Sequence, residues 1–130
     1  MLDNVLTHPL CQTVLVDNKI QDNGWKNLER HAARFDTYLG DSKVILPRMC
    51  GEFDIIYIDG DHSAKGALFD SVACWPRLKV GGIMLWDDYR RFEPEYGVWI
   101  AVNRFCECLN NKDFRVVLDN YQYAVEKLRL

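Results

Sequence analysis

Side chains that could bind a ligand or move a proton directly follow two hydrophobic stretches of this chain. They are Asp59, Asp61 and His62 after residues 53–58, and Asp87 and Asp88 after residues 82–86. In an open α/β sheet, ligands bind outside the carboxyl ends of parallel strands, so these groups are expected to share one cleft. A histidine beside carboxylates is suited to accept a proton. The sequence therefore predicts a chemically active site at this edge of a sheet.

Each of these residues also has a structural interpretation. Asp61 or Ser63 can cap the following helix, and His62 can make a single backbone hydrogen bond at a helix start. Arg90 and Arg91 either meet an anionic substrate or neutralise the aspartates, and we favour the second interpretation. The spacing of the two acidic turns favours a site over two unrelated turns.

Tyr57 and Tyr89, which lie close to the acidic turns, are interpreted as packing residues.

Composition limits the classes of protein that fit. The 130 residues are 48 % hydrophobic and 27 % charged, which suits one globular domain over residues 1–130. There is no apolar run long enough to span a membrane and no secretory signal pattern, so we expect a cytoplasmic protein without a membrane partner. The net charge of −3, with scattered basic residues, disfavours nucleic acid. A small molecule is the expected ligand.

The cysteines indicate neither disulfides nor zinc. There are five of them, and no two are spaced as a CxxC pair. An odd number without paired spacing does not suit a disulfide framework, and no histidine pair accompanies Cys106 and Cys108.

Strand-like and helix-like segments alternate along the chain, which predicts an α/β fold. Strands are predicted at 13–16, 34–39, 53–58 and 82–86, helices at 23–33, 43–49, from Ser63 to about 76–79 and at 96–109, and a hairpin at 114–118 and 121–125 around Asp119-Asn120. Val80-Gly81-Gly82 is predicted to turn the chain into the strand at 82–86, and Asp119-Asn120 to form a two-residue turn with positive φ. The predicted core faces are Trp25, Leu28 and Ala32; Leu68, Val72 and Trp75; and Trp99, Val102, Cys106 and Leu109.

Three motifs resemble a known family. They are Phe53-Asp-Ile-Ile-Tyr-Ile-Asp-Gly-Asp-His62, Trp75-Pro-Arg-Leu-Lys-Val-Gly-Gly82 and Leu85-Trp-Asp-Asp-Tyr89. Together they resemble class I S-adenosylmethionine (SAM)-dependent methyltransferases, most closely the metal-dependent sugar O-methyltransferases of macrolide and aminocoumarin biosynthesis. The resemblance covers roughly residues 12 to 128. It implies a Rossmann-like sheet, mostly parallel, with a C-terminal antiparallel hairpin.

The resemblance also implies roles for single residues. Asp59, Asp87 and Asp88 match the family's magnesium ligands, and Mg²⁺ prefers such hard oxygen donors. Asp59 or His62 would accept the proton of a small-molecule hydroxyl acceptor, and the sequence does not decide between them.

The SAM side of the site is matched by position. Asp17 ends the first visible strand, where the family binds the ribose hydroxyls of SAM. Asp41 and Ser42 match the turn near the adenine, and Asp59 is also assigned to the cofactor side.

One departure from the family pattern is clear. The family's first strand and its glycine-rich SAM loop should precede Thr13 by some 25 residues, and no GxG occurs in the 130 residues. We therefore expect an N-terminally truncated methyltransferase-like domain whose central strand is missing. Open strand edges favour pairing with another chain, so a homo-oligomer is expected. Two functions stay open: a SAM- and Mg²⁺-dependent O-methyltransferase, or a non-catalytic remnant acting as a homo-oligomeric interaction or small-ligand-binding module. A nicotinamide enzyme is disfavoured, because it too needs a glycine-rich turn.

Overall fold

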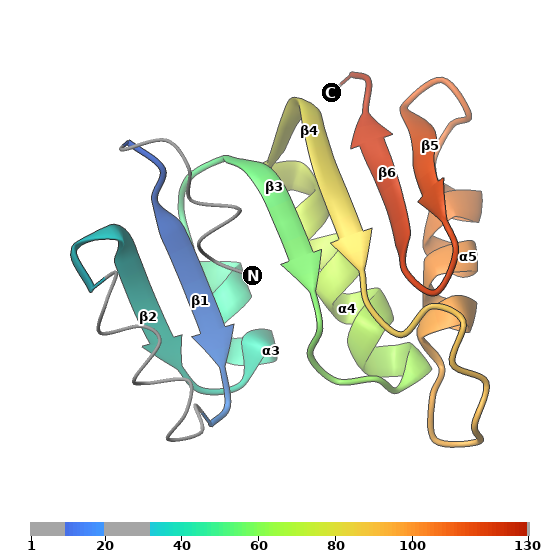
Figure 1. The fold of residues 1–130 in the computed structure, drawn as a ribbon, viewed down its shortest axis with the longest axis horizontal. Coiled ribbons are helices and arrows are strands. Elements are labelled where there is room, and N and C mark those ends of the chain that lie inside the picture. Colours follow the sequence, from blue (N-terminus) through green and yellow to red (C-terminus); the bar gives the residue numbers. More distant parts are fainter. Residues whose placement is uncertain (1–9, 20–31, 130) are drawn as a thin grey trace. The chain divides into compact units, whose positions relative to one another are not determined.

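The computed structural model describes residues 10–19 and 32–129 (Figure 1). The chain divides into two compact units, residues 1–45 and residues 46–130. That these units form a single domain, as the sequence predicts, stays a prediction. In the described part of the chain, no helix is both long and apolar enough to cross a membrane.

The first unit contains a short parallel sheet. Its elements are β1 (Thr13–Asp17), the 3₁₀ turn η1 (Ala32–Arg34), β2 (Phe35–Leu39) and α3 (Ser42–Ile45). The two strands pair in parallel, with Thr13 opposite Phe35 and Asp17 opposite Leu39. Both predicted strands are confirmed. Residues 23–31 of the predicted helix, with Trp25 and Leu28, lie outside the described residues.

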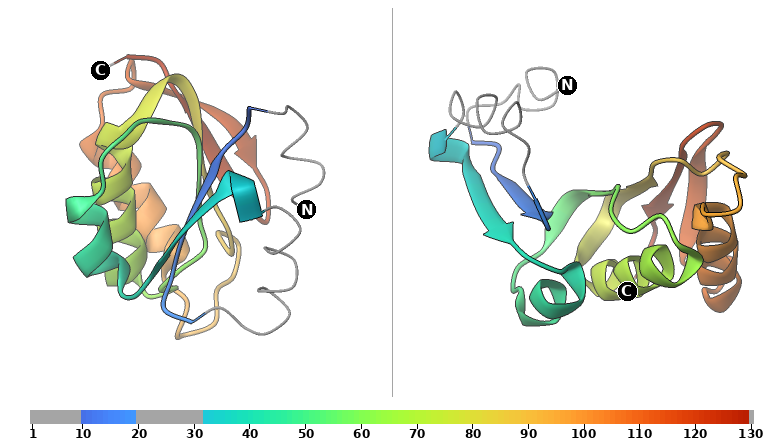
Figure 2. Two further views of the ribbon diagram at one scale, coloured as in Figure 1. Left: turned by 90° about the vertical axis from the view of Figure 1, so that its left-hand side faces the viewer. Right: turned by 90° about the horizontal axis from the view of Figure 1, so that it is seen from below.

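The second unit is a four-stranded sheet with two helices on one of its faces (Figure 2). Its elements are η2 (Leu46–Arg48), β3 (Phe53–Ile58), α4 (Ala64–Cys74), η3 (Trp75–Arg77), β4 (Leu78–Trp86), α5 (Val98–Cys108), β5 (Phe114–Asp119) and β6 (Tyr123–Lys127). The strand order is β3-β4-β6-β5, with β3 and β4 parallel and β6 antiparallel to both β4 and β5. The predicted combination of parallel strands with a C-terminal antiparallel hairpin is confirmed.

The core of the second unit lies between the sheet and helices α4 and α5. Trp86 is fully buried and packs against Phe105, with ring centroids 5.8 Å apart. Its indole Nε1–H donates to Ser71 Oγ at 2.8 Å, and that hydroxyl donates to the carbonyl of Ala67 at 2.6 Å. The buried polar groups of this core are therefore satisfied, as close packing requires.

The buried face of helix α4 differs from the predicted one. Its buried positions are Gly66, Ala67, Asp70, Ser71 and Cys74. Val72, predicted to face the core, is 57 % exposed. The buried residues are mostly small, which lets the helix approach the sheet closely enough for the Trp86 indole to reach Ser71. A pattern built from large apolar residues could not reveal this.

Helix α5 is also rotated relative to the prediction. Its buried residues are Val98, Ala101, Val102 and Phe105. Of the predicted face, only Val102 belongs to this buried set. Trp99 is 38 % exposed. Both sets have helical spacing, and the packing of Phe105 on Trp86 and Trp75 determines which one faces the sheet.

Strand β4 begins earlier than predicted. It already includes Leu78, so the glycines predicted to form a turn lie inside the strand. The β3–β4 register shifts between the pairs Phe53–Leu78 and Ile55–Ile83. Gly81 has φ +81°, and a Cβ on Gly82 would lie 2.9 Å from the carbonyl oxygen of Asp54. These glycines therefore allow an irregularity in the ladder rather than a chain reversal.

The hairpin is confirmed, but its turn is longer than predicted. Asp119 pairs with Tyr123, which leaves residues 120–122 in the turn. Among the described non-glycine residues, only Asp88 has a positive φ, so the prediction of positive φ at Asp119 and Asn120 is wrong. The Asn120 side chain stabilises the turn instead, because its Oδ1 accepts from the backbone N–H of Gln122 at 3.0 Å.

Candidate functional site

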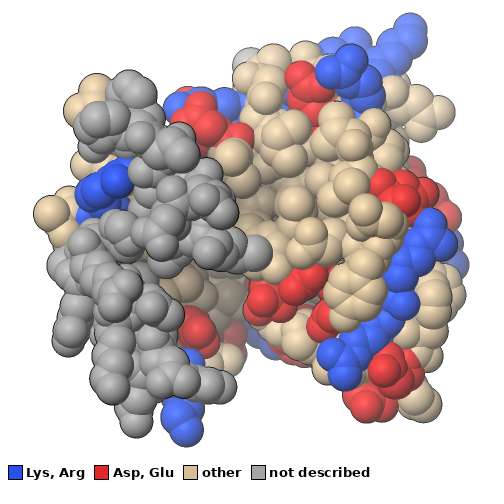
Figure 3. Space-filling view, in the orientation of Figure 1, with Lys and Arg blue, Asp and Glu red and all other residues tan. Residues whose placement is uncertain are grey.

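The carboxyl ends of β3 and β4 carry the two acidic turns side by side. The backbone N–H of Asp87 donates to the carbonyl of Ile58 at 3.0 Å, which continues the strand ladder by one residue beyond β4. Asp59 and Asp87 therefore leave the sheet as neighbours. In the space-filling view, acidic residues gather at this end of the sheet (Figure 3). The two acidic turns are adjacent, and that they share one cleft stays a prediction.

Local hydrogen bonds shape the turn after β3. Asp61 Oδ1 accepts from the backbone N–H of Ser63 at 3.0 Å, and Ser63 Oγ accepts from the N–H of Gly66 at 3.1 Å. Ser63 is thus the N-cap of α4, as the structural interpretation anticipated. Asp59 and His62 lie in this turn, between the end of β3 and the start of α4.

The turn after β4 has an unusual backbone. Asp88 has φ +52°, a left-handed conformation that residues with a Cβ seldom adopt. Its side chain is only 10 % exposed. Aspartate tolerates this conformation better than most residues do, but strain of this kind typically costs about 1 kcal/mol or more and concentrates at functional sites.

His62 lies between carboxylates from both turns. Its Nε2 is 3.4 Å from Asp59 Oδ1 and 3.6 Å from Asp88 Oδ2. Its ring stacks on Tyr96 with centroids 4.9 Å apart, and its carbonyl accepts from the backbone N–H of Gly97 at 2.8 Å. The segment before α5 therefore fixes the imidazole beside Asp59 and Asp88.

The hairpin turn supplies partners for the second pair of carboxylates. Tyr121 donates its hydroxyl to Asp88 Oδ1, and Gln122 Nε2 donates to Asp87 Oδ1 at 2.8 Å. Gln122 Nε2 also lies 3.5 Å from the hydroxyl of Tyr57. Two consecutive residues of the turn thus hold two consecutive aspartates that are more than 30 positions away in the sequence.

The carboxyl pKa values of Asp59 and Asp87 shift in opposite directions. Burial raises the pKa of Asp59, and the negative charges of Asp87 and Asp88 add to the rise against the hydrogen bond with His62. For Asp87, burial opposes ionisation, but hydrogen bonds from Gln122 and Tyr57 outweigh it and lower the pKa. The pKa of the Tyr57 hydroxyl is raised by burial and by its hydrogen bond with Asp87, so this hydroxyl stays protonated.

The donor set at this site suits a hard cation in its chemistry. Asp59, Asp87 and Asp88 offer carboxylate oxygens at one end of the sheet, and their mutual repulsion contributes to the raised pKa of Asp59. Among the described residues, however, no three His, Cys, Asp or Glu side chains are arranged to hold a metal ion. Gln122 and Tyr121 hold Asp87 and Asp88 in their present orientations.

Three of the four predicted SAM-side residues, Asp17, Asp41 and Ser42, lie together in the first unit. Gly40 donates its backbone N–H to the carbonyl of Asp17 at 2.9 Å, so the strand ends that carry Asp17 and Asp41 are adjacent. Asp41 Oδ1 accepts from the N–H of Lys43 at 2.9 Å at the start of α3, whose first residue is Ser42. Gly40 has φ +147°, which allows the close turn between β2 and this helix.

Comparison with known proteins identifies the family. A family described as "Methyltransferase domain" matches residues 3–89, two thirds of the chain. The chain belongs to this methyltransferase family. A search of curated proteins gives no match at a comparable level of significance.

Solved structures share the fold of this methyltransferase domain at low sequence identity. A putative O-methyltransferase from Klebsiella pneumoniae has a TM-score of 0.70 at 14 % identity, covering 91 % of this chain and 62 % of its own. The O-methyltransferase NovP has a TM-score of 0.70 at 14 % identity, and the match covers 98 % of this chain and 64 % of NovP. The third structure is the MycE methyltransferase of mycinamycin biosynthesis, in complex with Mg and S-adenosylhomocysteine. Its TM-score is 0.61 at 17 % identity, and the match covers 91 % of this chain and 38 % of MycE. The chain thus spans less than two thirds of each of these proteins.

Some residues at the candidate site of the methyltransferase domain are not predicted from the sequence. Tyr57, interpreted as packing, has its hydroxyl in the hydrogen-bond network of Asp87. The sequence predicts only a hairpin position for Tyr121 and Gln122, and only a helix start for Tyr96. One signal was available: a strand antiparallel to β4 must begin where β4 ends, so the hairpin turn has to lie beside Asp87 and Asp88.

The structure supports the neutralising interpretation for Arg91 only, because the partner of Arg90 is Asp119, which does not belong to the two acidic turns. Arg91 Nη1 lies 3.6 Å from Asp88 Oδ2, and its Nε lies 3.4 Å from Glu93 Oε2. Arg90 Nη2 pairs with Asp119 Oδ1 at 2.5 Å. Tyr89 is a packing residue as predicted, with its ring 4.6 Å from that of Tyr123.

Proposed function

We propose that this chain provides the catalytic part of a SAM-dependent O-methyltransferase that acts, with Mg²⁺, on a hydroxyl group of a small molecule. The observation that carries the proposal is the convergence of Asp59, His62 and Asp88 at adjacent strand ends of a methyltransferase fold. Ligands of open α/β sheets bind at this edge. MycE, a relative in fold, is complexed with Mg and S-adenosylhomocysteine, which agrees with both cofactors.

The proposed metal ligands are Asp59, Asp87 and Asp88. When bound, Mg²⁺ supplies Lewis-acid chemistry that lowers the pKa of an acceptor hydroxyl and orients its oxygen. In this proposal Gln122 and Tyr121 are positioning residues, because they hold Asp87 and Asp88 through hydrogen bonds. Such outer partners fix the orientation of metal ligands in proteins generally.

His62 is the proposed proton acceptor. Its Nε2 lies 3.4 Å from Asp59 Oδ1 and 3.6 Å from Asp88 Oδ2, at the strand ends where the acceptor is proposed to bind. Stacking on Tyr96 and the hydrogen bond to Gly97 keep the ring in this orientation. Asp59 remains the alternative base, and its raised pKa suits proton exchange.

The proposed SAM contacts of the first unit are Asp17, Asp41 and Ser42. Asp59 of the second unit stays a predicted SAM contact. A carboxylate at the end of β1 can accept hydrogen bonds from both ribose hydroxyls. Asp41 and Ser42 lie at the adjacent strand end, where the side chains of the turn can contact the adenine.

Isothermal titration of the protein with SAM, with and without millimolar Mg²⁺, tests the proposal. Micromolar binding is expected, and Asp17→Ala should weaken it by roughly 10-fold or more, because two charge-assisted hydrogen bonds are lost. Asp54→Asn is a matched control, since Asp54 pairs with Lys79 on the surface of β3. If no heat is observed at any concentration, the proposal is wrong and the non-catalytic alternative gains support.

Homo-oligomer formation also remains a proposal. β3 is an edge strand of the four-stranded sheet, and an edge strand offers free backbone groups to another chain. Light scattering at micromolar concentration tests it: we expect a dimer or larger assembly, and a monodisperse monomer would contradict the proposal.

A further inference from the structure

The turn after β3 contains Asp59-Gly60, which is the only Asp-Gly dipeptide among the 130 residues. At such a dipeptide the backbone nitrogen of the glycine can attack the aspartate side chain, because glycine has no Cβ to crowd the approach. Asp59 is a proposed metal ligand and the alternative proton acceptor. A chemical change at this residue would therefore alter the candidate site itself.

The reacting atoms are accessible in the structure. Asp59 and Gly60 lie between the end of β3 at Ile58 and the start of α4 at Ala64, so neither element fixes their backbone. The Asp59 side chain is 46 % exposed. Among the hydrogen bonds of the described residues, none is donated by the backbone N–H of Gly60. The nitrogen that has to act as the nucleophile is therefore available.

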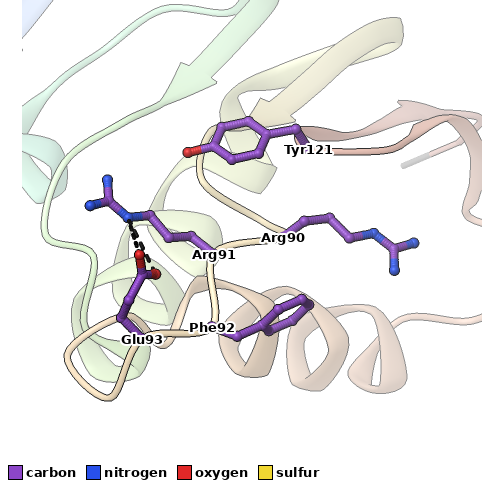
Figure 4. Close-up of a pocket in the computed structure, with 5 residues that line it drawn as sticks. All are labelled: Arg90, Arg91, Phe92, Glu93 and Tyr121. Carbon is purple, nitrogen blue, oxygen red and sulfur yellow. Dashed lines mark hydrogen bonds and ion pairs between the residues drawn. The ribbon is translucent and has the colours of Figure 1, made fainter.

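The second acidic turn lacks this combination. Asp87 and Asp88 are followed by Asp88 and Tyr89, whose side chains crowd the backbone nitrogen. The Asp88 carboxylate is 10 % exposed and is held by Tyr121 and Arg91. These two partners also line an open pocket of about 490 Å³ beside the turn (Figure 4). The packing around the second turn therefore holds its aspartates away from such a reaction.

Exposure alone does not select Asp59. Asp54 is 81 % exposed, but it lies inside β3 and is followed by an isoleucine. Asp61 is followed by a histidine, and its Oδ1 accepts from the backbone N–H of Ser63 at 3.0 Å. Both aspartates are close to Asp59 in the sequence, so they serve as internal references for its reactivity.

We propose that Asp59 isomerises spontaneously to isoaspartate through a cyclic imide formed with Gly60. The backbone nitrogen of Gly60 bonds to Cγ of Asp59, and the carboxyl OH leaves with the amide proton as water. Water then adds to the backbone carbonyl carbon of Asp59 and breaks its bond to the nitrogen. In the product the main chain runs through Cβ and Cγ, and a carboxylate is attached to Cα. One water is lost and one is regained, so the mass is unchanged.

The consequence for the site rests on the proposed function. Isomerisation moves one carbon from the side chain into the main chain, so the connection between β3 and α4 lengthens and the carboxylate arm shortens. In the unmodified protein Asp59 Oδ1 lies 3.4 Å from His62 Nε2, and the shortened arm withdraws the carboxylate from this position. The proposed metal site then loses a ligand, and its affinity for Mn²⁺ should fall by roughly 10-fold or more.

The test is a peptide map of the full chain after prolonged incubation at neutral pH and physiological temperature in metal-free buffer. The tryptic peptide of residues 49–65 contains Asp54, Asp59 and Asp61. We expect a second form of this peptide with unchanged mass, with the isoaspartate fragment ions of electron-transfer dissociation at residue 59 and at neither reference. The Asn23-Gly24 dipeptide, outside the described residues, falls in another tryptic peptide and does not interfere.

Two variants sharpen the test. Gly60→Ala should lose most of the isoaspartate signal, because its Cβ crowds the nitrogen. The φ of Gly60 is not positive, so alanine fits this backbone, but its Cβ would lie 3.2 Å from Asp70 Oδ2 and that carboxylate must shift by a few tenths of an ångström. Asp59→Glu avoids this contact. It should lose the signal completely, because a glutamate would have to form a larger ring.

Absence of isoaspartate at residue 59, equal amounts at the two references, or an unchanged signal in Gly60→Ala overturns the proposal. Mn²⁺ binding, followed by electron paramagnetic resonance, tests the consequence: the fraction of sites that bind should fall in step with the isomerised fraction. Full binding by isomerised protein overturns this consequence. If the fresh protein does not bind Mn²⁺, the metal part of the proposed function fails, and the peptide map alone still decides whether Asp59 isomerises.

Discussion

The two acidic turns of the candidate site are held in different ways. The turn after β3 is stabilised by neighbours in the sequence, since Asp61 and Ser63 bind N–H groups within three residues. The turn after β4 is stabilised from far away, by Tyr121 and Gln122 of the hairpin. It also contains the strained backbone of Asp88.

This difference shows where the evidence for function is strongest. The need to begin a helix explains Asp61 and Ser63 completely. No such local need explains a left-handed aspartate whose carboxylate is nearly buried and faces a histidine. Strain of this kind persists only where the surroundings impose it, and it is enriched at active sites. The Asp87–Asp88 turn is therefore the better indicator of a site.

The largest expected effect is at this second turn. Asp88→Asn keeps a residue that tolerates positive φ but removes the charge. Mn²⁺ binding, followed by electron paramagnetic resonance as a substitute for Mg²⁺, should weaken by roughly 100-fold or more, because losing a ligand exceeds the effect of losing an outer partner. Stability should change little.

Asp88→Ala serves as the companion variant. It removes the carboxylate, and it also leaves at φ +52° a residue that has no polar side chain to stabilise this backbone conformation. It should lose metal binding equally and cost about 1 kcal/mol of stability more than Asp88→Asn. Metal binding by Asp88→Asn at the level of the unmodified protein would contradict the proposed ligand set.

The next effect in size concerns the hairpin. Tyr121→Phe removes only the hydroxyl that binds Asp88. Metal affinity should fall by roughly 10- to 100-fold, the usual range for an outer partner. Tyr38→Phe, at an exposed position on β2, is the control and should have no effect. Equal behaviour of the two variants would mean that the hairpin does not position the second turn.

A smaller effect is expected at Gly97, whose backbone N–H donates to the carbonyl of His62 in the first turn. A Cβ on Gly97 would lie 2.5 Å from the backbone nitrogen of Ala64, so Gly97→Ala must displace the segment that holds His62. Crowding of this kind costs about 1–3 kcal/mol, measurable by urea denaturation. Gly51→Ala meets no atom within 4 Å but has φ +108°, so it isolates the cost of backbone strain. A neutral Gly97→Ala would show that this contact does not fix His62.

Much of this architecture could be predicted from the sequence because it depends on short-range signals. Strand runs that end in Asp17, Asp59 and Asp87 are local patterns, and parallel pairing then brings the acidic turns together. The cap at Ser63 and the final hairpin follow from equally local rules.

What could not be predicted depends on contacts between distant residues. Small residues on α4 rather than Val72 face the sheet, because Trp86 requires the helix to approach closely. Likewise, the roles of Tyr121 and Gln122 appear only when the three-residue turn brings them beside Asp88 and Asp87. Hydrophobic periodicity carries no information about such partners.

The smallest predicted effect compares the two turns directly, by urea denaturation in metal-free buffer between pH 7 and pH 3. The pKa of Asp59 is raised in the folded protein, so its favourable contribution is present at low pH and is lost as the pH rises through that pKa. Asp59→Asn should therefore be more stable than the unmodified protein at pH 7, with the gain disappearing toward pH 3.

The pKa of Asp87 is lowered, so its contribution is present at neutral pH and is lost as the pH falls through that pKa. Asp87→Asn should be less stable than the unmodified protein at pH 7. This loss of stability should persist to a lower pH than the gain of Asp59→Asn does, and it should disappear as the pH falls through the pKa of Asp87. Asp54→Asn, whose side chain is 81 % exposed, should change little at either pH. Effects of the same sign at positions 59 and 87 would mean that the two turns do not differ in electrostatic environment, and the separation of their roles would fail.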